Sequence, residues 1–127
     1  MSSTKRKPVI MVVDDSRSIL ETAGKFLGDD FTVVQVKNGF SALAAVQDRR
    51  PDLLFLDVVM PELDGHATCL AIKDNPDFSD LPIIILSSKD SPFDKAKGEQ
   101  MGCDDYLTKP FTEESLREKI RKHLRWS

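Results

Sequence analysis

Short runs of apolar residues alternate along the chain with longer segments in which apolar positions recur every three to four residues. The short runs are rich in Val, Ile and Phe and are bounded by turn residues, which is typical of strands buried on both faces of a sheet. The expected strands are Val9–Val13, Phe31–Val36, Leu53–Leu56, Leu81–Leu86 and, with a weaker pattern, Asp105–Thr108. The expected helices cover about Ser16–Leu27, Gly39–Arg49, Gly65–Asn75, Pro92–Met101 and Thr112–Trp126.

Residues that begin and end helices stand at the limits of these segments. Gly28 and Gly102 lie where helix C-caps are expected, and Ser91 followed by Pro92 is a typical helix start. Thr112, with two glutamates directly after it, is expected to cap the last helix. Five alternations of strand and helix predict an α/β fold, a (βα)5 flavodoxin-like doubly wound sandwich with a parallel sheet and helices on both faces.

The 127 residues have the length of one domain, and we expect a short disordered lead-in at residues 1–7 followed by a single domain at residues 8–127 with no output domain. The net charge of −3 provides no basic field for nucleic acid. No run approaches the roughly 18 apolar residues of a membrane span.

Cys69 and Cys103 form no zinc or disulfide pattern and fit a reducing cytoplasm. Four basic residues near the chain end are interpreted as a solvated face that matches the helix dipole: Lys119, Arg121, Lys122 and Arg125.

Polar side chains stand at the carboxyl ends of four expected strands, where ligands bind in an open parallel sheet. The strands concerned end in Asp14 and Asp15, in Asp57, in Ser87 and in Lys109. Taken singly, each residue has an ordinary structural explanation as a helix cap or a turn residue. Together, three carboxylates would repel one another unless a cation joins them. Oxygen ligands without His or Cys select a hard ion such as Mg²⁺.

Asp57 ends a buried apolar run, and Pro61 and Gly65 shape the loop that follows it. A carboxylate held rigidly beside a metal ion can act as a nucleophile toward phosphorus and form an aspartyl phosphate. The ammonium group of Lys109 would then hold the negative charge of the phosphoryl group. The sequence therefore predicts phosphoryl transfer to Asp57.

Four motifs, VVDDS, FLDVVMPELDG, ILSSK and YLTKPF, resemble in their order and spacing the receiver domain of two-component response regulators, over essentially the whole chain. The resemblance implies the strand order 2-1-3-4-5 of the chemotaxis regulator CheY. It makes Asp57 the phosphoacceptor, Asp15 a direct Mg²⁺ ligand and Asp14 a ligand that acts mainly through a bound water. The backbone carbonyl of Val59 would supply a further metal oxygen, and Mn²⁺ could replace Mg²⁺.

The same resemblance assigns roles to residues of the last two strands. Ser87 and Lys109 would bind phosphoryl oxygens, Ser87 and Tyr106 would form the switch, and the bond between Lys109 and Pro110 would be cis. The implied partners are a sensor histidine kinase as phosphodonor and a downstream protein that binds the face of the fourth helix, fifth strand and fifth helix. We expect a monomeric signalling switch with phosphoryl-acceptance and autodephosphorylation activity, not a conventional enzyme, with no nucleic-acid binding and no membrane insertion.

Two strings, SSKD at residues 87–90 and FDKAKG at residues 93–98, are similar to the stand-alone regulators of type IV pilus twitching motility, the PilG-like receivers. Ser88, Lys89 and Val59 are positions that tune the phosphoryl lifetime in the family. Ser88 replaces the usual Ala or Gly, and Val59 offers no polar side chain, so the dephosphorylation rate stays open.

Three other protein classes share parts of this pattern. A haloacid-dehalogenase-type phosphatase would need a second Asp two residues after its nucleophile, and Val59 occupies that position here. A flavodoxin-like FMN module would bind phosphate at the first loop, where Asp14 and Asp15 would repel it. A degenerate receiver that serves only as a protein-binding module would not be expected to keep all five polar site residues.

Overall fold

The protein is described by a computed structural model that covers residues 7–58, 65–87 and 103–124. Five parallel strands form one sheet in the order β2-β1-β3-β4-β5. This order confirms the prediction of a parallel doubly wound sheet. The strands are β1 (Val9–Val13), β2 (Thr32–Val36), β3 (Leu53–Asp57), β4 (Ile83–Ser87) and β5 (Asp105–Thr108).

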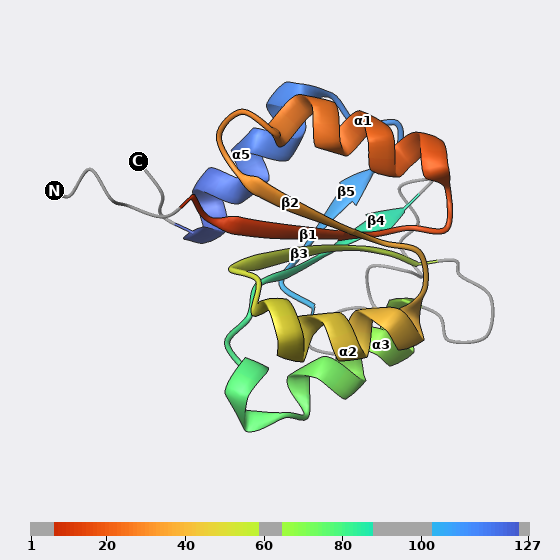
Figure 1. The fold of residues 1–127 in the computed structure, drawn as a ribbon, viewed down its shortest axis with the longest axis vertical. Helices are drawn as coiled ribbons and strands as arrows, with labels where there is room; N and C mark the ends of the chain where they lie inside the picture. The colour runs from red at the N-terminus through yellow and green to blue at the C-terminus, as the bar shows by residue number, and fades with distance from the viewer. Residues whose placement is uncertain (1–6, 59–64, 88–102, 125–127) are drawn as a thin grey trace, which may run out of the picture.

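Helices cover both faces of the sheet, with α1 and α5 on one face and α2 and α3 on the other (Figure 1). The expected helix at residues 92–101 lies outside the described residues, as do its proposed caps at Ser91 and Gly102. None of the described helices is long and apolar enough to cross a membrane. The helices are α1 (Arg17–Leu27), α2 (Gly39–Arg49), α3 (Gly65–Lys73), the short 3₁₀-helix η2 (Pro76–Phe78) and α5 (Glu113–Leu124).

Side chains that alternate along each strand form two separate hydrophobic cores. In β1, Met11 faces the core beneath α2 and α3, whereas Ile10 and Val12 face the core beneath α1 and α5. All three are at most 1% exposed. Burial of both faces explains why the strands β1, β3 and β4 read as continuous apolar runs and not as alternating patterns.

Several element boundaries differ from the sequence prediction by one or two residues, and two of these differences have a clear local cause. Helix α3 ends at Lys73 and not at Asn75, because the Asn75 side chain accepts the amide of Asp77 at 2.9 Å and begins η2 with Pro76. Strand β4 begins at Ile83, directly after Pro82, which has no amide hydrogen to donate to a neighbouring strand.

Two predicted helix starts are confirmed by side-chain hydrogen bonds. The Ser16 hydroxyl accepts the Ile19 amide at 3.4 Å and caps α1. Thr112 and Ser115 form a reciprocal cap at α5, in which each backbone amide donates to the other residue's hydroxyl, at 2.9 and 3.0 Å. These caps fix the helix ends that adjoin the carboxyl edge of the sheet.

Candidate functional site

Three carboxylates meet at the carboxyl edge of the sheet. Strands β1 and β3 are neighbours with Val13 opposite Leu56, so the next residues, Asp14 and Asp57, stand side by side. One oxygen atom from each of Asp14, Asp15 and Asp57 lies within 4.8 Å of the other two. The parallel topology therefore brings together acidic residues that are more than forty positions apart in the sequence.

The three acids differ in their surroundings. Asp14 is fully buried, and its Oδ1 accepts the amide of Ser16 at 2.8 Å. Asp57 is 4% exposed, whereas Asp15 is exposed to solvent. A buried carboxylate at position 57 therefore lies beside an exposed one at position 15.

A single ammonium group bridges the two buried acids. Lys109 Nζ lies 3.1 Å from Asp57 Oδ1 and 3.2 Å from Asp14 Oδ2. Burial by itself would lower the pKa of Lys109, but the hydrogen bonds and negative charges of Asp57 and Asp14 raise it above its ordinary value. Lys109 is therefore cationic, and an ionised cluster keeps a surplus of two negative charges, three carboxylates against one ammonium.

That surplus, together with an all-oxygen donor set, fits a divalent hard cation such as Mg²⁺. Asp15 would offer its exposed carboxylate, and Asp57 would share one oxygen with the ion. Both oxygens of Asp14 are already engaged by protein donors, the Ser16 amide and Lys109. This difference agrees with an indirect role for Asp14. Val59, the further ligand expected from the sequence, lies outside the described residues.

Lys109 is positioned by the last strand of the sheet. Its backbone amide donates to the Ser87 carbonyl at 2.6 Å, which continues the β4–β5 pairing one residue past Thr108. The peptide bond between Lys109 and Pro110 is cis. The strand pairing places Lys109 at the sheet edge, where its side chain contacts Asp57 and Asp14.

Gly65 explains part of the loop that follows Asp57. The Gly65 amide donates to the Val58 carbonyl at 2.9 Å, and a Cβ atom at position 65 would collide with the backbone carbonyl of Asp57. Only glycine allows the start of α3 to approach the end of β3 this closely. Pro61, the other loop residue singled out from the sequence, lies outside the described residues.

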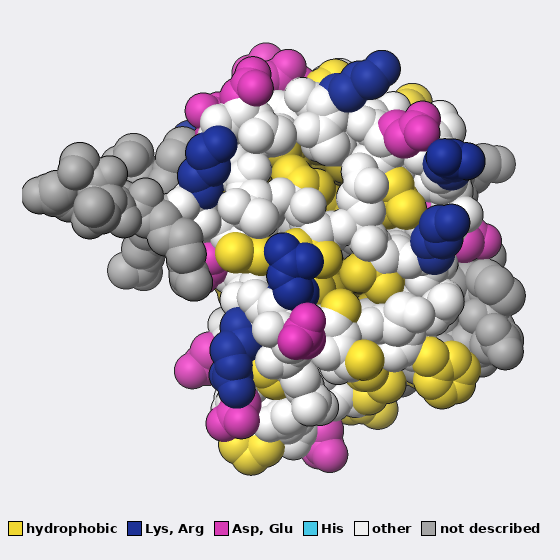
Figure 2. Space-filling view, viewed as in Figure 1, with side chains coloured by type: hydrophobic (Ala, Val, Ile, Leu, Met, Phe, Trp, Pro, Cys, Tyr) yellow, Lys and Arg dark blue, Asp and Glu magenta, His cyan; other side chains and the backbone are white. Residues whose placement is uncertain are grey.

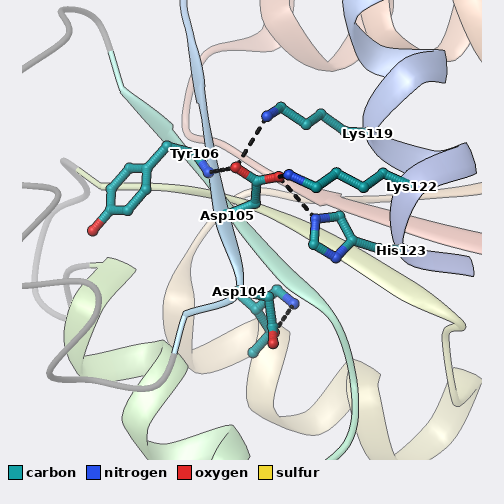
Figure 3. Close-up of polar contacts among 7 residues, drawn as sticks. Asp104, Asp105, Tyr106, Lys119, Lys122 and His123 are labelled. Atoms are coloured by element: carbon teal, nitrogen blue, oxygen red, sulfur yellow. Dashed lines mark hydrogen bonds and ion pairs between the residues drawn. The ribbon is translucent and has the colours of Figure 1, made fainter.

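Ser87 and Tyr106, the expected switch residues, both lie on the described part of the sheet. Ser87 ends β4 and is 7% exposed, one position beyond Leu86, which is opposite Asp57. Tyr106 is half-buried on β5, and its ring lies on the opposite side of the strand from the Asp105 carboxylate (Figure 3). Ser87 therefore lies next to the strand end that carries Asp57, and Tyr106 lies on the neighbouring strand β5.

The sequence interpretation missed the interactions of Asp105. Its carboxylate lies within hydrogen-bonding distance of Lys119 at 3.0 Å, Lys122 at 3.3 Å and His123 at 2.8 Å (Figure 3). The basic residues of α5 were expected to form a solvated face, but these ion pairs attach α5 to β5. Asp105 is 14 to 18 positions away from these basic residues in the sequence, so no local sequence pattern could have predicted the contacts.

Comparison with known proteins decides between the classes that share this arrangement. A family model described as "Response regulator receiver domain" matches residues 10–121. The chain belongs to this receiver family. A receiver domain has no need of the second Asp that a haloacid-dehalogenase phosphatase requires, so Val59 is no anomaly. The predicted fold and family are both confirmed.

Relatives of this receiver domain include proteins of different lengths. It is 48% identical over 118 residues to "Protein PilG" of Pseudomonas aeruginosa, covering 91% of this chain and 86% of that protein. It is 41% identical to "Response regulator MprA" of Mycobacterium ulcerans and spans about half of that protein's length (50%). The Vibrio cholerae chemotaxis protein CheY4 has a similar structure, with a TM-score of 0.89 at 31% identity and coverage of 93% of this chain and 99% of that chain.

Proposed function

We propose that this receiver domain is a signalling switch that accepts a phosphoryl group on Asp57 from the phosphohistidine of a sensor kinase. The observation that carries the proposal is the position of the Asp57 carboxylate, 3.1 Å from the Lys109 ammonium and beside two further acids. Asp57 is buried at the end of β3, a position that would hold the nucleophile in place. Receiver family membership supports the same role.

The transfer reaction follows from the groups at the site. An Asp57 carboxylate oxygen attacks phosphorus as the phosphorus–nitrogen bond of phosphohistidine breaks, and the bonding electron pair stays on the imidazole nitrogen. The Lys109 ammonium pairs with one phosphoryl oxygen, and the Ser87 hydroxyl donates to another. Mg²⁺, or Mn²⁺ in its place, held by Asp14, Asp15, Asp57 and the Val59 carbonyl, would supply neutralisation of the charge on the phosphoryl oxygens.

Output is proposed to leave through the face of the fourth helix, β5 and α5. A new charge at Asp57 attracts the Ser87 hydroxyl, and the Tyr106 ring fills the space that the hydroxyl leaves. This is a shift between two packings, limited by the differential affinity of the partner for each. Of this face, β5 and α5 lie in the described residues. The proposed downstream partner is a protein.

The cellular setting is proposed on similarity and charge. Similarity to PilG, together with the SSKD and FDKAKG strings, supports a stand-alone monomeric regulator of pilus or chemotaxis-type motility in the cytoplasm. On the face shown in Figure 2, basic and acidic side chains are interspersed, without a continuous basic field. With the net charge of −3, this supports a protein partner over nucleic acid.

Acetyl phosphate labelling followed by intact-mass measurement tests the proposal. Wild-type protein should gain one phosphoryl group with Mg²⁺ or Mn²⁺ and none with EDTA, and the adduct should be lost again by autodephosphorylation. Asp57→Asn keeps the shape of the side chain but removes the nucleophile, and should gain none. Equal labelling of the Asp57→Asn variant would contradict the proposal.

A further inference from the structure

Two cysteines that lie on different structural elements are in direct contact. Cys69 is on α3, Cys103 directly precedes β5, and the two Sγ atoms are 3.0 Å apart. Neither cysteine is in a disulfide in this structure. Cys69 is fully buried in the core beneath α2 and α3, whereas Cys103 is partly exposed. The pair therefore has one accessible sulfur and one protected sulfur.

Asp104, the residue after Cys103, also links the start of β5 to α3. The Asp104 carboxylate accepts Lys73 Nζ at 3.0 Å and the Ile83 amide at 2.8 Å. Lys73 and Cys69 are four positions apart on α3 and so lie on the same helix face. The α3 face thus meets two consecutive residues, Cys103 and Asp104, which fixes the separation of the two sulfur atoms.

We propose that Cys69 and Cys103 are a redox modification site that forms a reversible disulfide linking α3 to the start of β5. The present sulfur separation is about 1 Å longer than the roughly 2.05 Å of a disulfide bond, so small side-chain rotations suffice. The inference stands apart from phosphoryl transfer at Asp57.

The oxidant is a small disulfide such as oxidised glutathione. The accessible Cys103 sulfur, as thiolate, attacks one sulfur of the small disulfide, whose S–S bond breaks and releases one small thiolate. The Cys69 thiolate then attacks the Cys103 sulfur and displaces the second. Two protein thiols lose two protons and two electrons, and one small disulfide becomes two small thiols.

The electrostatic surroundings of the two thiols differ in the reduced pair. The hydrogen bond from Cys103 lowers the pKa of the Cys69 thiol, burial acts against it, and the charge of Lys73 lowers it further. The same hydrogen bond, with burial, raises the pKa of Cys103. In the reduced pair the buried Cys69 sulfur is therefore the better thiolate and can accept the proton of Cys103 as Cys103 attacks the small disulfide. In the mixed disulfide Cys103 no longer donates this hydrogen bond, and the charge of Lys73 continues to lower the pKa of Cys69 before it attacks.

Metal binding is the competing role for a close thiol pair. Among the described residues, the one group of side chains arranged for a metal ion is the Asp14, Asp15 and Asp57 cluster, which lies elsewhere. The carboxylate nearest to the thiols, Asp104, is already engaged by Lys73 and Ile83. The group of three or more metal-ligating side chains found in the described part of the chain does not include the two thiols, which favours oxidation over metal binding.

Intact-mass measurement of the full chain after incubation with oxidised glutathione tests the proposal. Because the sequence contains two cysteines, a loss of two hydrogen masses without a glutathione adduct identifies this disulfide. The folded wild type should show that loss, and dithiothreitol should reverse it. Cys69→Ser should instead retain one glutathione on Cys103, and Cys103→Ser should react far more slowly because Cys69 is buried.

A thermal melt provides a second measurement. The disulfide would close a loop between positions 34 apart, and the oxidised protein should melt on the order of 10 °C above its reduced form. A persistent glutathione adduct on the wild type, a disulfide formed between two chains, oxidation only in denaturant, or an unchanged or lowered melting temperature of the oxidised form would each overturn the proposal. None of these measurements involves Asp57, so their outcome does not depend on whether Asp57 is phosphorylated as proposed.

Discussion

The ammonium nitrogen of Lys109 lies 3.1 Å from Oδ1 of Asp57, and this contact joins the ends of strands that are not neighbours in the sheet. Strand β4 separates β3 from β5, so the lysine side chain reaches across the end of β4 at Ser87. Any new charge on Asp57 therefore acts directly on Lys109, the residue that follows β5. We therefore propose that Lys109 reports phosphorylation as well as assisting it.

Lys109→Ala should slow labelling and abolish signal transmission. Without the ammonium group, acetyl phosphate labelling should fall by on the order of 10²-fold, because one charged contact to the phosphoryl group is lost. The changes in NMR chemical shifts of β5 and α5 on adding beryllofluoride and Mg²⁺ should disappear. Lys25→Ala on α1, a control for the loss of an exposed lysine, should behave as wild type. Full shifts at Tyr106 in the Lys109→Ala variant would show that the transmission role is wrong.

Asp15→Asn should weaken Mg²⁺ binding more than Asp14→Asn. Asp14 is buried and engaged by Ser16 and Lys109, so it would act through water, and its loss should cost roughly 10-fold in affinity. Asp15 is exposed and would bind the ion directly, so its loss should cost at least roughly 10-fold more. Isothermal titration calorimetry measures the Mg²⁺ dissociation constant of each variant. Equal losses in the two variants would refute this division of roles.

Arg117→Met should destabilise the fold by about 1–2 kcal/mol. The guanidinium contacts Asp30 at 2.6 Å, Glu113 at 3.0 Å and the Phe26 carbonyl at 2.8 Å, and joins α5 to the end of α1. Methionine keeps much of the apolar stem and removes those contacts.

Urea unfolding measures this loss, and the α1 residue Arg17 provides a matched control. Its side chain is 84% exposed and pairs with Glu21 at 3.4 Å, so Arg17→Met should change stability by less than about 0.5 kcal/mol. If the two substitutions lower the free energy of unfolding equally, the contacts of Arg117 stabilise the fold no more than an exposed ion pair does.

Asp105→Asn should reduce the dependence of stability on acidic pH. Burial alone would raise the pKa of Asp105, but hydrogen bonds from His123, the Tyr106 amide and Lys119 lower it well below the ordinary value of 3.8. A carboxyl whose folded-state pKa is lowered adds stability above its unfolded-state pKa and loses it as pH falls toward the folded-state value. The stability advantage of wild type over Asp105→Asn should therefore shrink below about pH 4.

Urea unfolding of both proteins at a series of pH values measures this difference. If the difference in unfolding free energy between wild type and Asp105→Asn stays constant or grows as the pH falls, the lowered pKa of Asp105 is contradicted. The comparison also tests whether the ion pairs of Asp105 hold α5 against β5, because Lys119 and Lys122 lose their common partner in the variant.

The sequence by itself determined the order of strands and helices and the residues at the acidic edge. Hydrophobic periodicity is a local property, so β1 and α2 were predicted with the bounds that the structure shows. The proximity of Asp14 and Asp57 could be predicted because the carboxyl ends of parallel strands lie at one edge of the sheet. Four motifs in the correct order were sufficient to identify the family.

The tertiary structure alone decided which side chains meet across these elements. The bridge from Lys109 to Asp14, the ion pairs of Asp105 and the contact of Cys69 with Cys103 join residues 95, 14 to 18 and 34 positions apart. Sequence periodicity assigns a residue to a face but does not specify which residue of another element lies opposite. That choice depends on strand register and on how each helix packs on the sheet, and both are set by the core as a whole.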